Sequence, residues 1–418
     1  MKIDRRNFLA AVSAVAATGA GPPSKSPKPR VAFLGTVIRK HSHAQHFLDR
    51  HTLGYTWNGR WQDPRIDIAS VYIDQVPNDD LSAGRIARHK LQQFSSIAEA
   101  LTLGGNELAV DGVILIGEHG EYPKNEKGQK RYPRYDWFKQ VVKVFEQSGR
   151  SVPVFNDKHL STKWDECVEM VEDARRLKFA FLAGSSLPVT RRIPSIDMPL
   201  DAPLKESVCV AYGGVDSYDI HALETAQCMS ERRKGGEVGI RQVHALRGDS
   251  LWSRLAERDC ESTRKLIVSA LTRSHNLPVE TGFPSDRVDF EWTRRTFPKT
   301  VGYLIEHLDG FRTTMLLTDI RDFNYAGILD SGEIISCQMY LPMPGHGSTT
   351  ADFFNPLARH VESTILEKRT PYPVERTLLT SGMVIAGVES LHAGEEPIAT
   401  PNMKVTYAAP TESTYWQK

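Results

Sequence analysis

Four groups of polar side chains in this sequence combine residue types that can move protons or bind a metal ion. They are His41, His43 and His46; Glu118, His119, Glu121 and Tyr122; Asp157, Lys158 and His159; and His221. Imidazoles, carboxylates and a lysine are the side chains of general acid–base catalysis. Imidazoles together with carboxylates also form divalent metal sites. A glutamate, Glu224, follows His221 at a spacing that would place both on one face of a helix.

The first three groups each follow a short apolar run that predicts a β-strand. These runs are residues 31–34, 112–116 and 152–155, and a further run at 66–73 ends just before Asp74. In a doubly wound sheet, ligands bind outside the carboxyl ends of the strands, so residues that follow different strands meet in one crevice. We therefore expect the four groups to lie around a single site.

Apolar runs and amphipathic helical patterns alternate from residue 30 to about residue 190. Further strands are expected near Phe94 and at 179–182, and helices at 97–101, 137–145 and 164–177. This alternation predicts an α/β, Rossmann-like, doubly wound parallel sheet. An insertion at residues 51–64, which carries Trp57 and Trp61, lengthens the first connection and could cover the crevice.

The pattern changes beyond residue 200. Strands are expected at 208–212, 243–246, 300–308, 311–319, 324–329 and 334–341, with helices at 218–232, 353–367 and 374–391. This order predicts an α+β domain with an open, mainly antiparallel sheet. We place the Rossmann-like domain at 30–190, the second domain at 191–395 and a tail at 396–418. The open sheet face would suit a homo-oligomer.

The N-terminus and the composition set limits on location and partners. Arg5 and Arg6, followed by an alanine-rich stretch, predict a twin-arginine signal and linker over residues 1–29, and hence export to the periplasm or beyond. The 418 residues carry a net charge of +1 and are 40 % hydrophobic, which gives no electrostatic case for nucleic acid. No later segment predicts stable membrane insertion.

The first strand leads into a turn that departs from the dinucleotide-binding fingerprint. After Gly35, that fingerprint places glycines at 37 and 40, whereas Val37 and Lys40 stand here. Glycine allows the backbone to approach a diphosphate closely, and a side chain at either position occupies that space. The turn predicts the fold of a nucleotide-binding domain with an altered phosphate site.

Several stretches, taken in order, resemble one family of proteins. They are residues 94–101 with 110–116, residues 154–160, the run from Gly213 and Gly214 to His221, and the helical stretch 377–390. Together they resemble the glucose-fructose oxidoreductase and inositol dehydrogenase family (Gfo/Idh/MocA). The resemblance implies an oxidoreductase that acts on a carbohydrate or polyol and uses NAD or NADP.

The resemblance also implies roles for individual residues. Lys158 stands at the position of the family's catalytic-site lysine, flanked by Asp157 and His159, and His221 stands at the substrate-site histidine. Ser217 replaces the aspartate that the family usually carries four residues before that histidine. The implied cofactor-binding residues are Gly35, Thr36, Val37, Asp74 and Glu118.

The residues themselves leave two alternatives open. The first is a metal- or base-assisted lyase, epimerase or hydrolase of sugars on the same fold, with a divalent metal at His41, His43, His46, Glu118 and His119. The second is a non-catalytic sugar-binding protein. Hydrogen-bond donors and flat faces of the kind that sugars stack on are offered by Arg131, Tyr132, Arg134 and Tyr135, together with Trp57 and Trp61. In all three cases a small carbohydrate is the expected partner.

Overall fold

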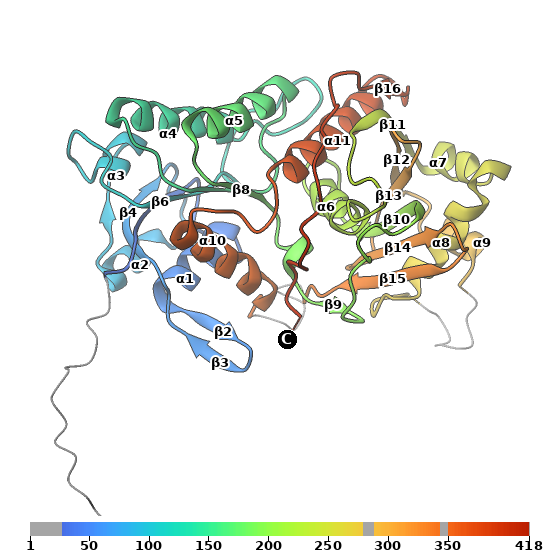
Figure 1. Cartoon of the computed structure of the whole chain (residues 1–418), viewed down its shortest axis with the longest axis horizontal. Coiled ribbons are helices and arrows are strands. Elements are labelled where there is room, and N and C mark those ends of the chain that lie inside the picture. Colours follow the sequence, from blue (N-terminus) through green and yellow to red (C-terminus); the bar gives the residue numbers. More distant parts are fainter. Residues whose placement is uncertain (1–26, 279–287, 343–349, 418) are drawn as a thin grey trace, which may run out of the picture.

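Two sheets, one in each half of the molecule, organise the chain (Figure 1). The structure is a computed structural model that describes residues 27–278, 288–342 and 350–417. Most of the predicted signal, residues 1–26, therefore lies outside the described residues. In the described part, no helix is long and apolar enough to cross a membrane.

The first sheet has six strands in the order β5-β4-β1-β6-β7-β8, and its neighbours pair in parallel. Its strands are β1 (Arg30–Gly35), β4 (Asp67–Ile73), β5 (Gln92–Gln93), β6 (Gly112–Ile116), β7 (Val154–Asp157) and β8 (Phe181–Gly184). The predicted doubly wound sheet is confirmed. The last two strands begin and end two residues later than predicted, so Asp157 is the final residue of β7 instead of the second residue after the strand.

Helices cover both faces of this sheet because successive strand residues point to opposite sides. The helices are α1 (His43–Leu53), α2 (Ser82–His89), α3 (Ile97–Thr102), α4 (Arg134–Ser148) and α5 (Trp164–Leu177). Leu34 of β1 packs with Phe138 of α4 and Met170 of α5. Its neighbour Phe33 packs on the other face with Phe47 of α1.

One helix on the first sheet comes from late in the chain. Helix α10 (Asn355–Glu367) lies beside α1 in Figure 1 and packs its Leu357 and Val361 against that sheet. Asn355 also accepts a hydrogen bond from Arg50 of α1, at 2.7 Å. Helix α10 thus lies within the range predicted for the second domain but covers the first sheet.

The second sheet has eight strands in the order β16-β11-β12-β13-β10-β14-β15-β9. They are β9 (Arg192–Ile193), β10 (Leu204–Tyr212), β11 (Ile240–Arg247), β12 (Val301–His307), β13 (Arg312–Thr318), β14 (Phe323–Leu329), β15 (Ile334–Met339) and β16 (Ile398–Ala399). Only β10 and β13 pair in parallel among these described strands. The predicted mainly antiparallel sheet is confirmed.

Both faces of the second sheet are covered. Helices α6 (Asp219–Ser230) and α11 (Glu375–His392) lie on the side toward the first domain, and α7 (Gly248–Leu255), α8 (Glu261–Leu271) and α9 (Phe290–Thr296) lie on the other side. Trp252 of α7 and Leu266 of α8 pack with Val208 and Leu316 of the sheet. The expectation of an open face for self-association is therefore wrong for this face, because amphipathic helices that we did not predict bury it.

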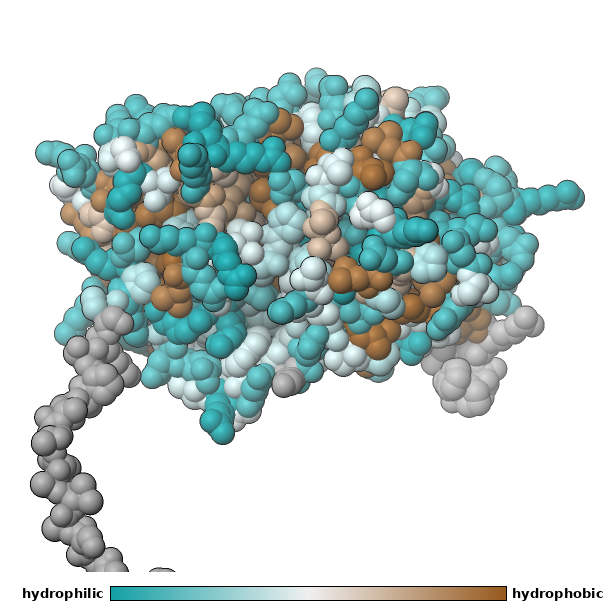
Figure 2. All heavy atoms as spheres, viewed as in Figure 1, coloured by the Kyte–Doolittle hydropathy of each residue, from teal (hydrophilic) through white to brown (hydrophobic). Residues whose placement is uncertain are grey.

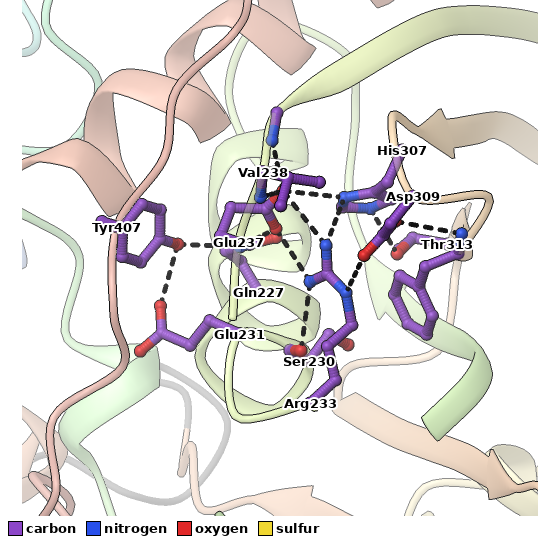
Figure 3. A network of polar contacts seen from close by, with 12 residues as sticks. Gln227, Ser230, Glu231, Arg233, Glu237, Val238, His307, Asp309, Thr313 and Tyr407 are labelled. Atoms are coloured by element: carbon purple, nitrogen blue, oxygen red, sulfur yellow. Dashed lines mark hydrogen bonds and ion pairs between the residues drawn. The ribbon is translucent and has the colours of Figure 1, made fainter. Parts of the chain in front are cut away.

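A buried polar cluster, which we call the Glu237 network, joins α6 to β12 and to the C-terminal segment (Figure 3). Its members are Gln227, Glu231, Arg233, Glu237, His307, Asp309 and Tyr407. Glu237 accepts hydrogen bonds from Gln227 at 2.7 Å, from Arg233 at 3.0 Å and from the Gly239 amide at 2.8 Å. Arg233 also donates to Asp309, at 2.9 Å. Each charge in this network faces an opposite charge or a hydrogen-bonding group.

The surface is mainly polar on the face shown in Figure 2, with apolar residues in several separate patches. The large apolar side chains that are exposed come from distant parts of the chain, for example Leu53, Trp61 and Leu366. A few exposed apolar side chains are ordinary on a protein surface.

Candidate active site

A cavity of about 360 Å³ lies where the carboxyl ends of β1, β6 and β7 face α6 of the second domain. Its lining residues are His41, His43, His46, Glu118, His119, Tyr132, Arg134, Lys158, His159, Ser186, Leu187, Asp216, Ser217, Tyr218, His221, Phe323, Leu341, Phe353 and Phe354. The volume suits one small ligand. Members of all four predicted polar groups line this cavity, whereas Glu121, Tyr122 and Asp157 are not among its lining residues.

Local backbone conformation places the reactive side chains at the cavity. Ser42 caps α1 by accepting a hydrogen bond from the Gln45 amide, so that the helix begins at His43. His41, His119 and Lys158 have φ values of 66°, 62° and 62°, in the left-handed region that side chains with a Cβ rarely adopt. Such conformations are costly and concentrate at functional sites.

Five side chains form the centre of the site, and we call them the Lys158 cluster: His43, Glu118, Asp157, Lys158 and His221. His43 Nδ1 lies 2.9 Å from both carboxylate oxygens of Asp157, and the His43 amide donates to Glu118 Oε1 at 2.6 Å. Lys158 Nζ contacts the other Glu118 oxygen. The ring of His221 lies 6.1 Å from that of His43, and its buried Nδ1 has no hydrogen-bond partner in the part of the chain that the structure describes.

Arg134, the first residue of α4, supports this cluster from below. It is 3 % exposed, donates from Nε to the Gly117 carbonyl at 2.9 Å, and has Nη1 2.9 Å from His159 Nε2. Because an arginine can only donate, His159 must accept through Nε2. His159 is therefore held by a buried cation, while its Nδ1 has no partner among the described residues.

Burial shifts the pKa values of the titratable groups in the site so that their uncharged forms are favoured. It lowers the pKa of Lys158 to about 7 and raises the pKa of Asp157 to about 8. Burial also lowers the pKa values of His43, His159 and His221 well below the usual histidine range, with the charge of Lys158 adding to the effect. Lys158 and Asp157 therefore exchange protons near neutral pH, and shifts of this kind are characteristic of active sites.

Most amides of the turn after β1 donate within the protein and are therefore not free to bind a phosphate. Dinucleotide folds bind the diphosphate with the backbone N–H groups at the start of this helix. Here the Thr36 amide donates to the Ile116 carbonyl, the Ile38 amide to Asp80 and the Arg39 amide to Ser42. The His41 amide donates to Gln45, the Ser42 amide to the Arg39 carbonyl and the His43 amide to Glu118. The anion at the start of α1 is the carboxylate of Glu118.

The groove beside this turn is bridged by side chains. Gln75 exchanges two hydrogen bonds with the Glu121 backbone, at 3.1 Å and 2.9 Å, and so joins the loops that follow β4 and β6. Asp74, the residue expected at the ribose, accepts hydrogen bonds from Tyr72 at 2.8 Å and Tyr122 at 2.5 Å. The residues after β1, β4 and β6 do not fit a bound dinucleotide in this arrangement.

The predicted site residues separate into two sets. Lys158, His221, His159 and Glu118 line the cavity, and Asp157 reaches it through His43. Gly35, Thr36, Val37 and Asp74, predicted for the cofactor, do not line it. Thr36 and Val37 are buried instead, and Thr36 donates a hydrogen bond to the Glu118 carbonyl.

The predicted metal set is only partly brought together. His43 and Glu118 converge with Asp157, which was not in the predicted set. His41 and His46 stack with ring centroids 6.5 Å apart, and His46 also stacks on Phe354 at 4.6 Å. His119 Nε2 lies 3.2 Å from Glu118, while its Nδ1 faces Arg39 at 2.8 Å.

The expectation that the insertion at 51–64 covers the crevice is wrong. Its end forms the hairpin β2 (Tyr55–Trp57) and β3 (Arg60–Gln62), and none of the residues that line the cavity comes from it. Trp57 stacks on Trp416 of the C-terminal segment, with ring centroids 4.9 Å apart. Trp61 is exposed. These tryptophans therefore do not face the cavity, whereas Tyr132 and Arg134 do.

Sequence reasoning missed part of the cavity wall. Phe353 and Phe354 precede α10 and reach the cavity from far along the chain, while Asp216 and Tyr218 precede α6. Phe353 and Phe354 could have been noticed in the sequence as two adjacent aromatic residues directly before an Asn-Pro helix start. No local pattern marked Asp216.

Solved structures with the same arrangement, in which the carboxyl ends of a Rossmann-like sheet face a mainly antiparallel domain, match the chain. GenD2 from gentamicin A biosynthesis, determined in complex with NAD, matches with a TM-score of 0.54 and 12 % identity, over 91 % of this chain and 99 % of that one.

Two further solved structures give similar values. A putative myo-inositol dehydrogenase from Sinorhizobium meliloti 1021 has a TM-score of 0.52 and 10 % identity, over 89 % of this chain and 99 % of that one. A probable dehydrogenase from Thermotoga maritima has a TM-score of 0.53 and 9 % identity, over 88 % and 98 %. No family model and no curated protein matches the sequence. At these identities the likeness establishes the fold.

Proposed function

We propose that this protein is an exported, divergent member of the Gfo/Idh/MocA family that moves protons on a small carbohydrate without passing hydride to a dinucleotide. Glu118 carries the proposal. Its carboxylate accepts the His43 amide at the start of α1 and contacts Lys158, so the chain itself occupies the place where the fold binds a diphosphate. The acid–base groups beside it become the reactive part of the site.

The proposed reaction breaks a C–H bond next to a carbonyl or carboxyl group of the substrate. Lys158, as the free amine, takes the proton while the electron pair of the C–H bond moves onto the carbonyl oxygen, where Arg134 adds positive charge. Return of a proton to the opposite face gives epimerisation, and departure of a group from the next carbon gives elimination. His221 lines the same cavity and supplies or receives the second proton.

Hydrogen exchange in D₂O tests this proposal without a coupled assay. The purified protein is incubated with aldoses, ketoses and uronic acids, with no dinucleotide added, and deuterium uptake or elimination is followed by NMR. We expect uptake with one substrate class and its loss in Lys158→Met. Lys143→Met, on the exposed face of α4, is the matched control. Saturable binding with no exchange and no turnover would instead indicate a sugar-binding protein.

An NAD(P)-dependent oxidoreductase of carbohydrates or polyols is the second candidate. It is favoured by the fold, which covers 91 % of the chain in the match to GenD2 bound to NAD. A ligand that binds only the native state raises its stability, so a thermal shift with NAD or NADP would support this candidate. Turnover that requires the dinucleotide would overturn the proton-transfer proposal.

Export through the twin-arginine route is part of the same proposal. Replacing Arg5 and Arg6 with lysine should keep the protein in the cytoplasm of an expressing host, whereas the natural sequence should reach the periplasm. Self-association also remains a prediction, and the sedimentation coefficient of the purified protein measures it.

A further inference from the structure

Three side chains with metal-binding atoms converge at the floor of the cavity. His43 begins α1, Glu118 follows β6 and Asp157 ends β7, and these elements surround neighbouring strand ends of the parallel sheet. One ligand atom from each residue lies within 4.8 Å of the other two. The set is neither purely acidic nor built on a helix terminus alone, because it joins one imidazole with two carboxylates.

The separations match the edges of a coordination polyhedron. His43 Nδ1 lies 2.9 Å from Asp157 Oδ2 and 3.9 Å from Glu118 Oε1. Metal–ligand bonds of about 2.0–2.2 Å in a tetrahedron place neighbouring ligand atoms roughly 3.3 Å apart. These two separations bracket this value, and the ligand atoms of Glu118 and Asp157 lie within 4.8 Å of each other. Modest side-chain rotations would bring the three atoms onto one ion.

A bound dication would also stabilise the anionic form of two buried carboxyl groups. Glu118 and Asp157 are 2 % and 1 % exposed, and buried carboxylates need positive partners. Lys158 contacts Glu118, whereas the side-chain partner of Asp157 in the structure is His43. An ion between the two carboxylates would take over Glu118 and release Lys158 toward the substrate.

A second observation points to a ligand at this place. His221 lines the same cavity, is 6 % exposed, and has a buried Nδ1 for which the described residues offer no hydrogen-bond partner. Its ring lies 6.1 Å from that of His43. A buried polar atom without a partner is unfavourable unless something binds it, such as a metal-bound water or the substrate.

We infer that His43, Glu118 and Asp157 bind one divalent transition-metal ion of the Zn²⁺ or Mn²⁺ kind, with its open coordination positions facing the cavity. One imidazole and two carboxylates are ligands that these ions accept. The role of the ion rests on the proposed function, since it would polarise the carbonyl oxygen of the substrate. Binding of the ion does not depend on that function and is measured separately.

The test uses the full-length chain after removal of bound metal with a chelator. Isothermal titration and native mass spectrometry with Zn²⁺ and Mn²⁺ should each show one ion per chain. We expect Glu118→Gln and His43→Gln to lower the affinity at least about 100-fold. The variant His392→Gln, on the exposed end of α11, should bind as the natural protein does. Absence of binding, or equal binding by all variants, overturns the inference.

Two further measurements keep the inference independent of folding defects and of the reaction. Co²⁺ added to the natural protein should give the visible absorption of a histidine-bound ion, and an unchanged aquo-ion spectrum contradicts the site. Lys158→Met should bind Zn²⁺ at least as tightly as the natural protein, because a cation that competes for Glu118 is gone, and weaker binding overturns this arrangement.

One tightly bound ion with no deuterium exchange would sustain the metal site while refuting the proposed function. Full exchange in chelated protein would sustain the function and overturn the role of the ion.

Discussion

The Lys158 cluster and the Glu237 network are built from the same kinds of side chain, yet they treat charge in opposite ways. Each combines carboxylates, a basic residue and histidine in a buried place. In the Glu237 network, Glu237 alone accepts from Gln227, Arg233, His307 and two backbone amides (Figure 3). In the Lys158 cluster, the His221 Nδ1 has no hydrogen-bond partner within residues 27–278, 288–342 and 350–417, and the backbone at Lys158 is in the left-handed region.

The pKa values make the same contrast. Burial opposes the charge of Glu237, but His307 and Arg233 outweigh it and hold the pKa of Glu237 well below its usual value. In the cavity, burial prevails and brings the pKa of Lys158 down to about 7. The comparison teaches that the number of opposing partners, rather than burial itself, separates a charged cluster that stabilises the fold from one that exchanges protons.

The largest expected effect comes from Lys158→Met. Loss of a general acid–base group lowers turnover by roughly 10²- to 10⁴-fold. The unfolding free energy should change less than in the Glu237 variant below, because the folded environment already disfavours the charged ammonium. Rate measurement on the substrate found by deuterium exchange, together with urea unfolding, checks both. Full activity in this variant would remove Lys158 from the mechanism.

Glu237→Ala should show the opposite behaviour. It leaves Arg233 and His307 buried with one partner fewer, and breaking a buried ion pair in this way costs about 3–5 kcal/mol of stability. The folded fraction should keep the turnover number of the natural protein, since the network lies outside the residues that line the cavity. Urea unfolding measures the loss. A variant as stable as the natural protein would erase the contrast between the two regions.

The contribution of Glu237 to the free energy of unfolding should decrease in acid. Because the folded-state pKa of Glu237 lies below the unfolded value near 4.5, this group stabilises the fold above that pH, and its contribution disappears as pH falls further. The stability gap between the natural protein and Glu237→Gln should therefore be constant from pH 6 to 8 and shrink below about pH 4.5. Unfolding curves at pH 7 and pH 4 measure the gap. A gap that does not depend on pH would mean that Glu237 is not held as an anion.

The sequence predicted the parallel sheet well because buried strands carry continuous apolar runs with turn residues between them. It also predicted that groups after different strands would meet, since that follows from the sheet alone. Helices α7, α8 and α9 were missed because no element was predicted between residues 246 and 300, although Trp252 and Leu266 lie on apolar helix faces. Their presence changes a sheet face from exposed to buried.

Side-chain partners were the part of the site that the sequence could not give. The three histidines after β1 look equivalent in the sequence, but the helix that begins at His43 turns only this one toward Asp157 and Glu118. His46, one turn later, packs on Phe354, which comes from far along the chain. Which imidazole faces a carboxylate depends on a helix start and on a long-range contact, and neither is encoded by local spacing.

The smallest expected effect is that of Ser42→Ala, which tests whether the turn before α1 can still bind a diphosphate. Ser42 Oγ accepts the Gln45 amide at 3.1 Å and the Arg39 amide at 3.2 Å, so Ser42→Ala should lower the unfolding free energy by about 1 kcal/mol. In a dinucleotide site, the diphosphate would satisfy the freed amides, and NAD would then restore the lost stability through binding to the native state. We expect no such recovery in thermal unfolding with and without NAD, because Glu118 remains at the start of α1 and repels a second anion. Recovery specific to Ser42→Ala would show that the turn still accepts a diphosphate, and the Lys158 cluster would then belong to a dehydrogenase site in its closed form.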